Sequence, residues 1–134
     1  MANILYLVHR LPYPPNKGDK VRSYHLLKHL ARQHRVFLGT FIDDPEDEVH
    51  VAAVRTICAD LHVSRLNPRW ARISSLNALL SGDPLTLRYY RRSSLSDWVH
   101  RVCHTNHIEA VVIFSSAMAQ YAEGFQRLPT LIDF

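Results

Sequence analysis

Residues able to bind an anion gather in the loop that follows the first apolar run of the chain. The loop holds Asn16, Lys17, Gly18 and Asp19, and Lys20 and Arg22 add positive charge just beyond it. Glycine lets the backbone approach a ligand closely, and the unpaired N–H groups at the start of a helix attract negative charge. A phosphate site is therefore one interpretation of this loop. An ordinary glycine turn before a helix is the other, since neither a G-x-G-x-x-G nor a Walker lysine motif is present.

A second polar pair, Ser115-Ser116, follows another apolar run at residues 110–114. Both hydroxyls are candidates for contacting a ligand, although Ser116 could instead cap the short helix expected after it. No G-x-S-x-G motif surrounds either serine, so a catalytic nucleophile is not predicted there.

Nine histidines raise the question of a metal site. His25 and His29 are four residues apart, and a second group with suitable spacing comprises His100, Cys103, His104 and His107. On a helical projection the histidines of both groups lie on polar faces, with Cys103 at the border of its apolar stripe. A solvated surface explains them better than a metal site, and we expect neither a metal nor a cofactor.

A basic and aromatic stretch occupies residues 69–92. Its candidates for contact with an anionic membrane or a lipid phosphate are Trp70, Arg88, Arg91 and Arg92. Arginine side chains interleaved with aromatic rings suit such a surface, and they also suit single-stranded nucleic acid. A packed connection with solvated arginines explains the same residues without any ligand.

Two alternating periodicities predict the elements that position these side chains. Strands are predicted at 4–8, 36–41, 61–66, 110–114 and 130–133, with amphipathic helices between them. This alternation indicates an α/β fold with a Rossmann-like, doubly wound parallel sheet. The two most apolar strands, 4–8 and 110–114, should be central and adjacent, which predicts the order 3-2-1-4-5. Ligands bind such a sheet at the switch point between its first and fourth strands, where loops 9–19 and 115–117 meet.

An acidic block at residues 43–48 opens a further predicted helix. Pro45 suits the first helical position, and the acidic side chains after it complement the positive end of the helix dipole without any ligand. The stripe predicted to face inward comprises Val49, Ala52, Ala53, Thr56 and Ile57.

Length and composition describe one ordinary globular domain. A chain of 134 residues with 47% hydrophobic and 21% charged residues is not disordered. The net charge of +4 is uneven, because residues 1–42 carry seven Lys and Arg against one acid, so we expect anionic partners on selected faces.

No apolar run approaches the ~20 residues of a membrane span, and no basic stretch marks a secretory signal. Two cysteines outside any C-x-x-C arrangement suit the cytoplasm.

Several strings of this sequence resemble a known family. They are NILYLVHR (3–10), PYPPNKGDKVRS (12–23), LGTFIDDP (38–45), LTLRYY (85–90) and FSSAMAQY (114–121). They resemble the family 4 glycosyltransferases, and more narrowly the sugar transferases associated with PEP-CTERM/exosortase systems in exopolysaccharide-producing bacteria. The resemblance implies a GT-B architecture in which residues 1–134 form the N-terminal, acceptor-side domain, truncated before a donor-binding C-terminal domain. Gly18-Asp19 stands where relatives carry paired glycines, and Ser115-Ser116 where many carry a histidine.

The resemblance also implies an activity. The full-length protein would be a retaining hexosyltransferase that moves a sugar from a nucleotide-sugar to a saccharide or lipid-linked acceptor in exopolysaccharide biosynthesis, and the fragment alone would be inactive. The donor would be a co-substrate held mainly by the C-terminal domain. The resemblance also implies a peripheral contact with the cytoplasmic face of an anionic inner membrane. No nucleic acid is expected as a partner. The alternative function is a non-catalytic, flavodoxin-like module that binds phosphate or another anion.

Overall fold

The computed structural model describes residues 2–13, 15, 18–42, 45–65, 93–115, 118–119, 121 and 128–133. The strands are β1 (Asn3–Val8), β2 (Arg35–Ile42), β3 (Asp60–Arg65), β4 (Ala110–Phe114) and β5 (Thr130–Asp133). The helices are α1 (Gly18–Gln33), the 3-10 helix η1 (Pro45–His50), α2 (Val51–Arg55) and α5 (Ser93–Thr105). The predicted helices over residues 67–82 and 116–124 fall wholly or largely outside the described residues.

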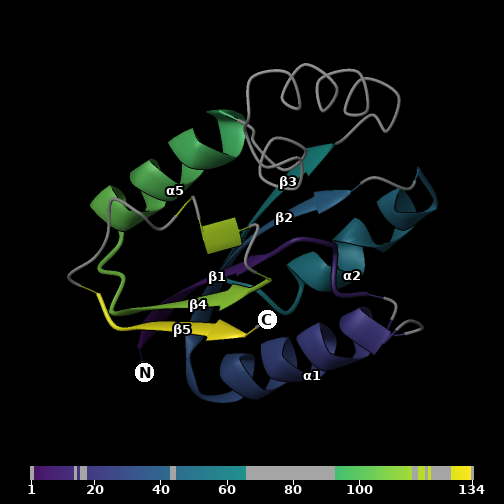
Figure 1. Ribbon diagram of the computed structural model, residues 1–134, viewed down its shortest axis with the longest axis horizontal. Coiled ribbons are helices and arrows are strands. Elements are labelled where there is room, and N and C mark those ends of the chain that lie inside the picture. The colour runs from purple at the N-terminus through teal and green to yellow at the C-terminus, as the bar shows by residue number, and fades with distance from the viewer. Residues whose placement is uncertain are drawn as a thin grey trace, which may run out of the picture.

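The five strands form one parallel sheet in the order β3-β2-β1-β4-β5, which confirms the predicted fold class and topology (Figure 1). The central strand β1 pairs with β2 on one side and with β4 on the other. Its residues from Ile4 to Val8 are all buried, as a continuous apolar run predicts for a strand covered on both faces. At the far edge of the sheet, Leu131 and Ile132 of β5 are 60% and 39% exposed.

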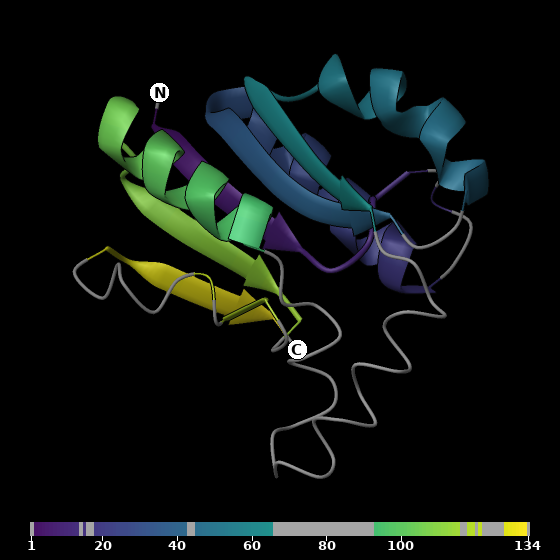
Figure 2. The same cartoon turned by 90° about the horizontal axis from the view of Figure 1, so that it is seen from above.

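Helices cover the sheet on both faces, with α5 on one side and α1 and α2 on the other (Figure 2). The alternation of side chains along β1 divides the core accordingly. Leu5 and Leu7 pack in the cluster that contains α5, whereas Tyr6 and Val8 pack in the cluster that contains Leu27 of α1. Each buried Leu or Val side chain contributes about 1.5–3 kcal/mol to the stability of the fold.

Helix α5 presents the predicted apolar face to the sheet, with Leu95, Trp98, Val99 and Val102 all buried. The helix lies close to β2 at Gly39, which has no side chain to keep it away. A Cβ at this position would lie 2.9 Å from Leu95 Cδ1 and 3.0 Å from both Leu7 Cδ2 and Trp98 Cζ3. Gly39 therefore permits the close contact between α5 and the sheet.

The inward stripe predicted for the segment after residue 44 is wrong except at Ile57, which is partly buried against the core. Val49 is 77% exposed, and Ala52 and Ala53 are exposed as well, whereas Val54 is fully buried. Residues 45–50 form a 3-10 helix, which has three residues per turn rather than 3.6, so the phase of the following turn differs from that of a continuous α-helix. The buried position of this turn is taken by Asp47.

None of the described helices combines the length and the apolar character that a membrane crossing requires.

Candidate functional site

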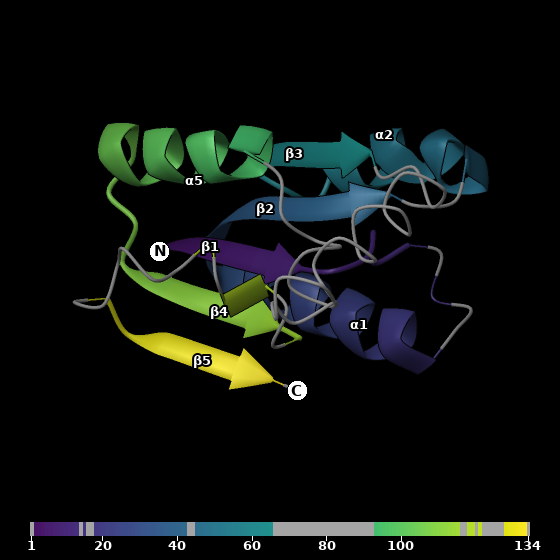
Figure 3. The same cartoon turned by 45° about the horizontal axis from the view of Figure 1, so that its top comes forward.

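The ends of β1 and β4 form the switch point that the strand order predicts. Val8 and Phe114 are partners in the parallel register, so the residues that follow them, His9 and Ser115, leave the sheet side by side. Figure 3 shows the two strand ends at the edge of the sheet where α1 also begins. In open parallel sheets this edge, where the order of the strands reverses, is the usual place of ligand binding.

A cationic side chain and an imidazole gather on Phe114 at this edge. The His9 ring stacks on the Phe114 ring with a centroid distance of 6.0 Å and an interplanar angle of 3°. The Arg22 guanidinium carbon lies 5.5 Å from the centroid of the same ring, a cation–π contact that contributes about 0.5–1 kcal/mol at an exposed site. Three segments thus meet at one point: the loop after β1, the first turns of α1 and, some 90 residues later, the end of β4.

Ser115 has a backbone conformation that is uncommon for a residue with a side chain. Its φ is 86°, in the left-handed region, which costs about 1–2 kcal/mol for an L-residue. Its carbonyl oxygen accepts a hydrogen bond from Met118 N at 3.1 Å. Such strained residues concentrate at ligand sites. The structure therefore places Ser115 at the switch point, as predicted, while Ser116 lies outside the described residues.

The predicted loop site is present only in part. Gly18 is the first residue of α1, and a Cβ added to it would meet no atom within 4 Å. Its φ is not left-handed, so the turn does not depend on the conformational freedom of glycine, although the space beside it is open. Asn16, Lys17 and the side chain of Asp19 lie outside the described residues, as do Trp70, Arg88, Arg91 and Arg92.

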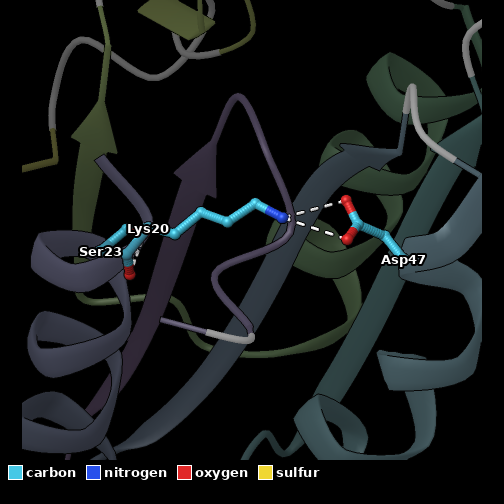
Figure 4. Close-up of polar contacts among 3 residues, drawn as sticks. All are labelled: Lys20, Ser23 and Asp47. Atoms are coloured by element: carbon cyan, nitrogen blue, oxygen red, sulfur yellow. Dashed lines mark hydrogen bonds and ion pairs between the residues drawn. The ribbon is translucent and has the colours of Figure 1, made fainter. Parts of the chain in front are cut away.

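Lys20 does not contribute its charge to this loop, contrary to the sequence interpretation. Its Nζ donates hydrogen bonds to both carboxylate oxygens of Asp47 at 3.1 Å, and the two side chains are 6% and 11% exposed. Figure 4 shows the lysine extended from α1 to the carboxylate on η1. A cation buried with a bidentate anion is neutralised where it lies, because separating the two would leave both charges unpaired in the interior.

The helical periodicity of α1 contains a signal that could have predicted the buried pair of Lys20 and Asp47. Lys20 lies three and seven residues before Ser23 and Leu27, both of which are buried, so it shares the inward stripe of α1. A lysine on an inward stripe needs an acidic partner, and the acidic block supplies Asp47. The neighbouring Glu48 instead accepts hydrogen bonds from Arg65 of β3, and this contact lowers the pKa of the Glu48 carboxyl.

Aromatic rings make a second link between α1 and η1. Tyr13, in the loop after β1, lies between Tyr24 of α1 and His50 of η1, with centroid distances of 5.6 and 5.3 Å. The row continues to His25, whose ring is 5.8 Å from that of Tyr24. Because Tyr13 belongs to the same loop as the anion-site candidates, these rings help to position that loop.

A polar cluster that the sequence interpretation missed lies under α5. His62 Nε2 is 3.0 Å from Ser64 Oγ, and its ring stacks on Trp98 at a centroid distance of 5.6 Å. Ser64 Oγ is 3.3 Å from Ser94 Oγ, and Trp98 Nε1 donates a hydrogen bond to Asp60 Oδ2 at 3.3 Å. Burial, with Arg101 nearby, lowers the pKa of His62. The alternation of apolar and polar side chains along β3 was the available signal.

The histidines on helices lie on exposed faces, as the helical projection predicted. His25 and His29 of α1 and His100 and His104 of α5 are all exposed. Within the part of the chain that the structure describes, no three His, Cys, Asp or Glu residues are grouped as metal ligands would be. Burial raises the pKa of the Cys58 thiol to about 12 and that of Cys103 to about 11, so both are protonated at neutral pH and poor nucleophiles.

Comparison with known proteins finds no family model and no curated protein that matches this chain. A solved structure that is similar is described as a predicted subunit of tRNA methyltransferase from Methanocaldococcus jannaschii. The two share 11% sequence identity, the match covers 98% of this chain and 67% of that chain, and the TM-score is 0.44. A likeness at this level carries no argument about function.

These comparisons overturn the resemblance to the family 4 glycosyltransferases. No family model and no curated protein supports it. Several of the strings that carried the resemblance lie on elements that any sheet of this kind needs. Segment 3–10 contains β1, segment 38–45 contains the second half of β2, and segment 114–121 contains the buried Phe114, Met118 and Tyr121. The apolar composition of these segments follows from burial rather than from a shared activity.

Proposed function

We propose that this chain binds phosphate or another small anion at the switch point, in a site formed by His9, Gly18, Arg22, Phe114 and Ser115. The observation that carries the proposal is the convergence of His9 and Arg22 on Phe114 beside the left-handed Ser115. A cationic group, an imidazole and a hydroxyl-bearing residue from three separate segments lie at the edge where parallel sheets bind ligands. The proposal concerns binding rather than a reaction.

The electrostatics of α1 support an anionic ligand. The start of a 16-residue helix carries a partial positive charge equivalent to about half an elementary charge, and its first N–H groups have no partner within the helix. Gly18 opens the helix with unoccupied space beside it. Arg22 lies one turn later with its guanidinium over the Phe114 ring, and the charge of Lys20 is neutralised by Asp47. The site therefore suits a small anion better than a highly charged one.

The test is a titration of the chain with inorganic phosphate, followed by backbone amide shifts in NMR spectra and by calorimetry. Wild-type protein should show shifts centred on Gly18 and Ser115. Arg22→Gln should weaken phosphate binding about tenfold, the equivalent of roughly 1.4 kcal/mol. Arg32→Gln is the matched control, because it removes the same charge from the same helix about 15 Å further along its axis. Equal losses of phosphate affinity in the two variants, or chemical-shift changes spread over the whole surface, would show that phosphate is attracted by the general positive charge and is not bound at this site.

The cytoplasmic location and the membrane contact of residues 69–92 remain predictions from the sequence. Flotation of the chain with anionic vesicles, before and after Arg88, Arg91 and Arg92 are changed to Ser, tests the contact. Unchanged flotation would exclude it.

A further inference from the structure

The outward face of α1 is basic along most of its length. Its exposed residues include three Arg or Lys and two His: Arg22, Lys28 and Arg32, with His25 and His29. Four of them follow the spacing i, i+3, i+7 and i+10, which places them in a line about 15 Å long on one side of a helix. The acid of α1 is Asp19 in its first turn, and the sequence contains no Asp or Glu from residue 20 to residue 42, so none follows within α1 or β2 beside His25, Lys28, His29 and Arg32.

Aromatic rings border this basic face. The His25 ring is exposed and lies edge-on to that of Tyr24, which is followed by Tyr13 and His50 in the row that links α1 to η1. Lys28 Nζ lies 5.6 Å from the centroid of the Tyr24 ring. Cations and half-exposed rings are thus interleaved on one surface, the arrangement that proteins use to hold a sugar–phosphate backbone while bases stack on side chains.

A lipid surface suits the same face less well. Binding of a helix to a bilayer depends on apolar side chains that enter the interface beside the charges. The apolar side of α1 is turned into the core, where Leu27 is fully buried, and the large hydrophobic residue exposed on the helix is Val21 at 36%. The observations favour a partner that combines regularly spaced phosphates with planar rings.

We propose that the outer face of α1, together with Tyr24 and His25, binds single-stranded nucleic acid. Arg22, Lys28 and Arg32 contact successive phosphates, and a base stacks on the His25 ring beside Tyr24. The sequence predicted no nucleic acid as a partner. We depart from that expectation because the structure places these side chains on one exposed face. This inference goes beyond the anion site at the switch point, with which it shares Arg22, and does not require that site.

Fluorescence anisotropy with a labelled 12-nucleotide single strand, measured over a series of salt concentrations, tests the proposal. The variant Lys28→Gln/Arg32→Gln should bind at least tenfold more weakly, and the slope of log K against log salt should fall by about 1.4, since each lost phosphate contact removes about 0.7. His25→Ala should weaken binding about fivefold or more with the slope unchanged, because a stacking contact carries no charge. The matched control is Arg55→Gln/Arg101→Gln, which removes two exposed charges from α2 and α5.

Three results would overturn the proposal: an equal loss in the control, an unchanged affinity in both α1 variants, or binding of vesicles containing phosphatidylserine at these residues without binding of the oligonucleotide. The inorganic phosphate titration separates this proposal from the previous one. If phosphate binds at Gly18 and Ser115 while oligonucleotide affinity does not depend on Lys28 and Arg32, the nucleic-acid proposal is wrong and the anion site is supported. If the oligonucleotide depends on Lys28 and Arg32 while phosphate does not bind, the anion site fails instead.

Discussion

The two helical layers are held to the same sheet by different kinds of contact. On the side of α1 and η1, a buried ion pair between Lys20 and Asp47 spans two elements, and Tyr6 Oη donates a hydrogen bond to the Ser23 carbonyl of the same helix. On the side of α5, the contact is apolar and close at Gly39, and the polar groups beside it are hydroxyls, an imidazole and the Asp60 carboxylate, without a buried ion pair among the described residues. The first layer is therefore sensitive to the loss of a charge, and the second to added volume and to protonation.

The largest expected effect comes from removing one charge of the buried pair. Asp47→Asn should lower the free energy of unfolding by about 3–5 kcal/mol, because the Lys20 ammonium is left buried without its anion. Urea denaturation monitored by circular dichroism measures the loss.

Two further variants sharpen this test. Lys20→Met/Asp47→Leu should recover most of the lost stability, since it removes both buried charges together. Glu48→Gln breaks the exposed contact with Arg65 and should have a much smaller effect. If Asp47→Asn proved no worse than Glu48→Gln, the α1 layer would not depend on the buried charge.

Added volume at Gly39 should destabilise the packing of α5 on the sheet. Gly39→Ala places a methyl group within 3.0 Å of three side chains, so α5 must shift or the side chains must leave their preferred rotamers. A loss of about 1–3 kcal/mol in the free energy of unfolding is expected. Gly18→Ala is the control, because its methyl group would meet open space. Equal stabilities of the two variants would show that the contact at Gly39 is loose.

The smallest expected effect is a pH dependence specific to the α5 layer. The folded chain lowers the pKa of His62 below its ordinary value of 6.5 because burial disfavours the charged ring. Unfolded chains therefore take up this proton at a higher pH than folded ones, so stability should be full above pH 6.5 and should decrease as the pH falls below it. His62→Gln should flatten this part of the profile in urea titrations between pH 7.5 and 5.5.

His25→Gln provides the comparison for that measurement, because it removes an exposed histidine from the other layer. If His62→Gln left the dependence of stability on pH unchanged, the buried ring would have no role in it. The same conclusion would follow if His25→Gln flattened that dependence equally.

Much of the scaffold could be predicted from local patterns. The strand periods predicted β1 to β5 and their order, and the helical period predicted which side chains of α5 face the sheet. The same reasoning failed after residue 44, where a 3-10 turn changed the phase and exposed Val49. Separately, the resemblance to a glycosyltransferase family rested in part on strings whose apolar content reflects burial. Periodicity reports burial reliably because every residue of a regular element obeys the same repeat, and it reports neither activity nor local departures from the repeat.

By itself, the sequence of this protein determined a parallel α/β sheet whose first and fourth strands end side by side. The tertiary structure alone decided what meets there. It joined Lys20 to Asp47 across 27 residues, brought Arg22 and His9 onto Phe114, set Ser115 in a left-handed conformation and placed His62 under α5. The physical reason is that hydrophobic periodicity depends on the nearest few residues along the chain. Ion pairs, ring contacts and backbone strain depend instead on which distant segments the folded sheet brings within a few ångströms of one another.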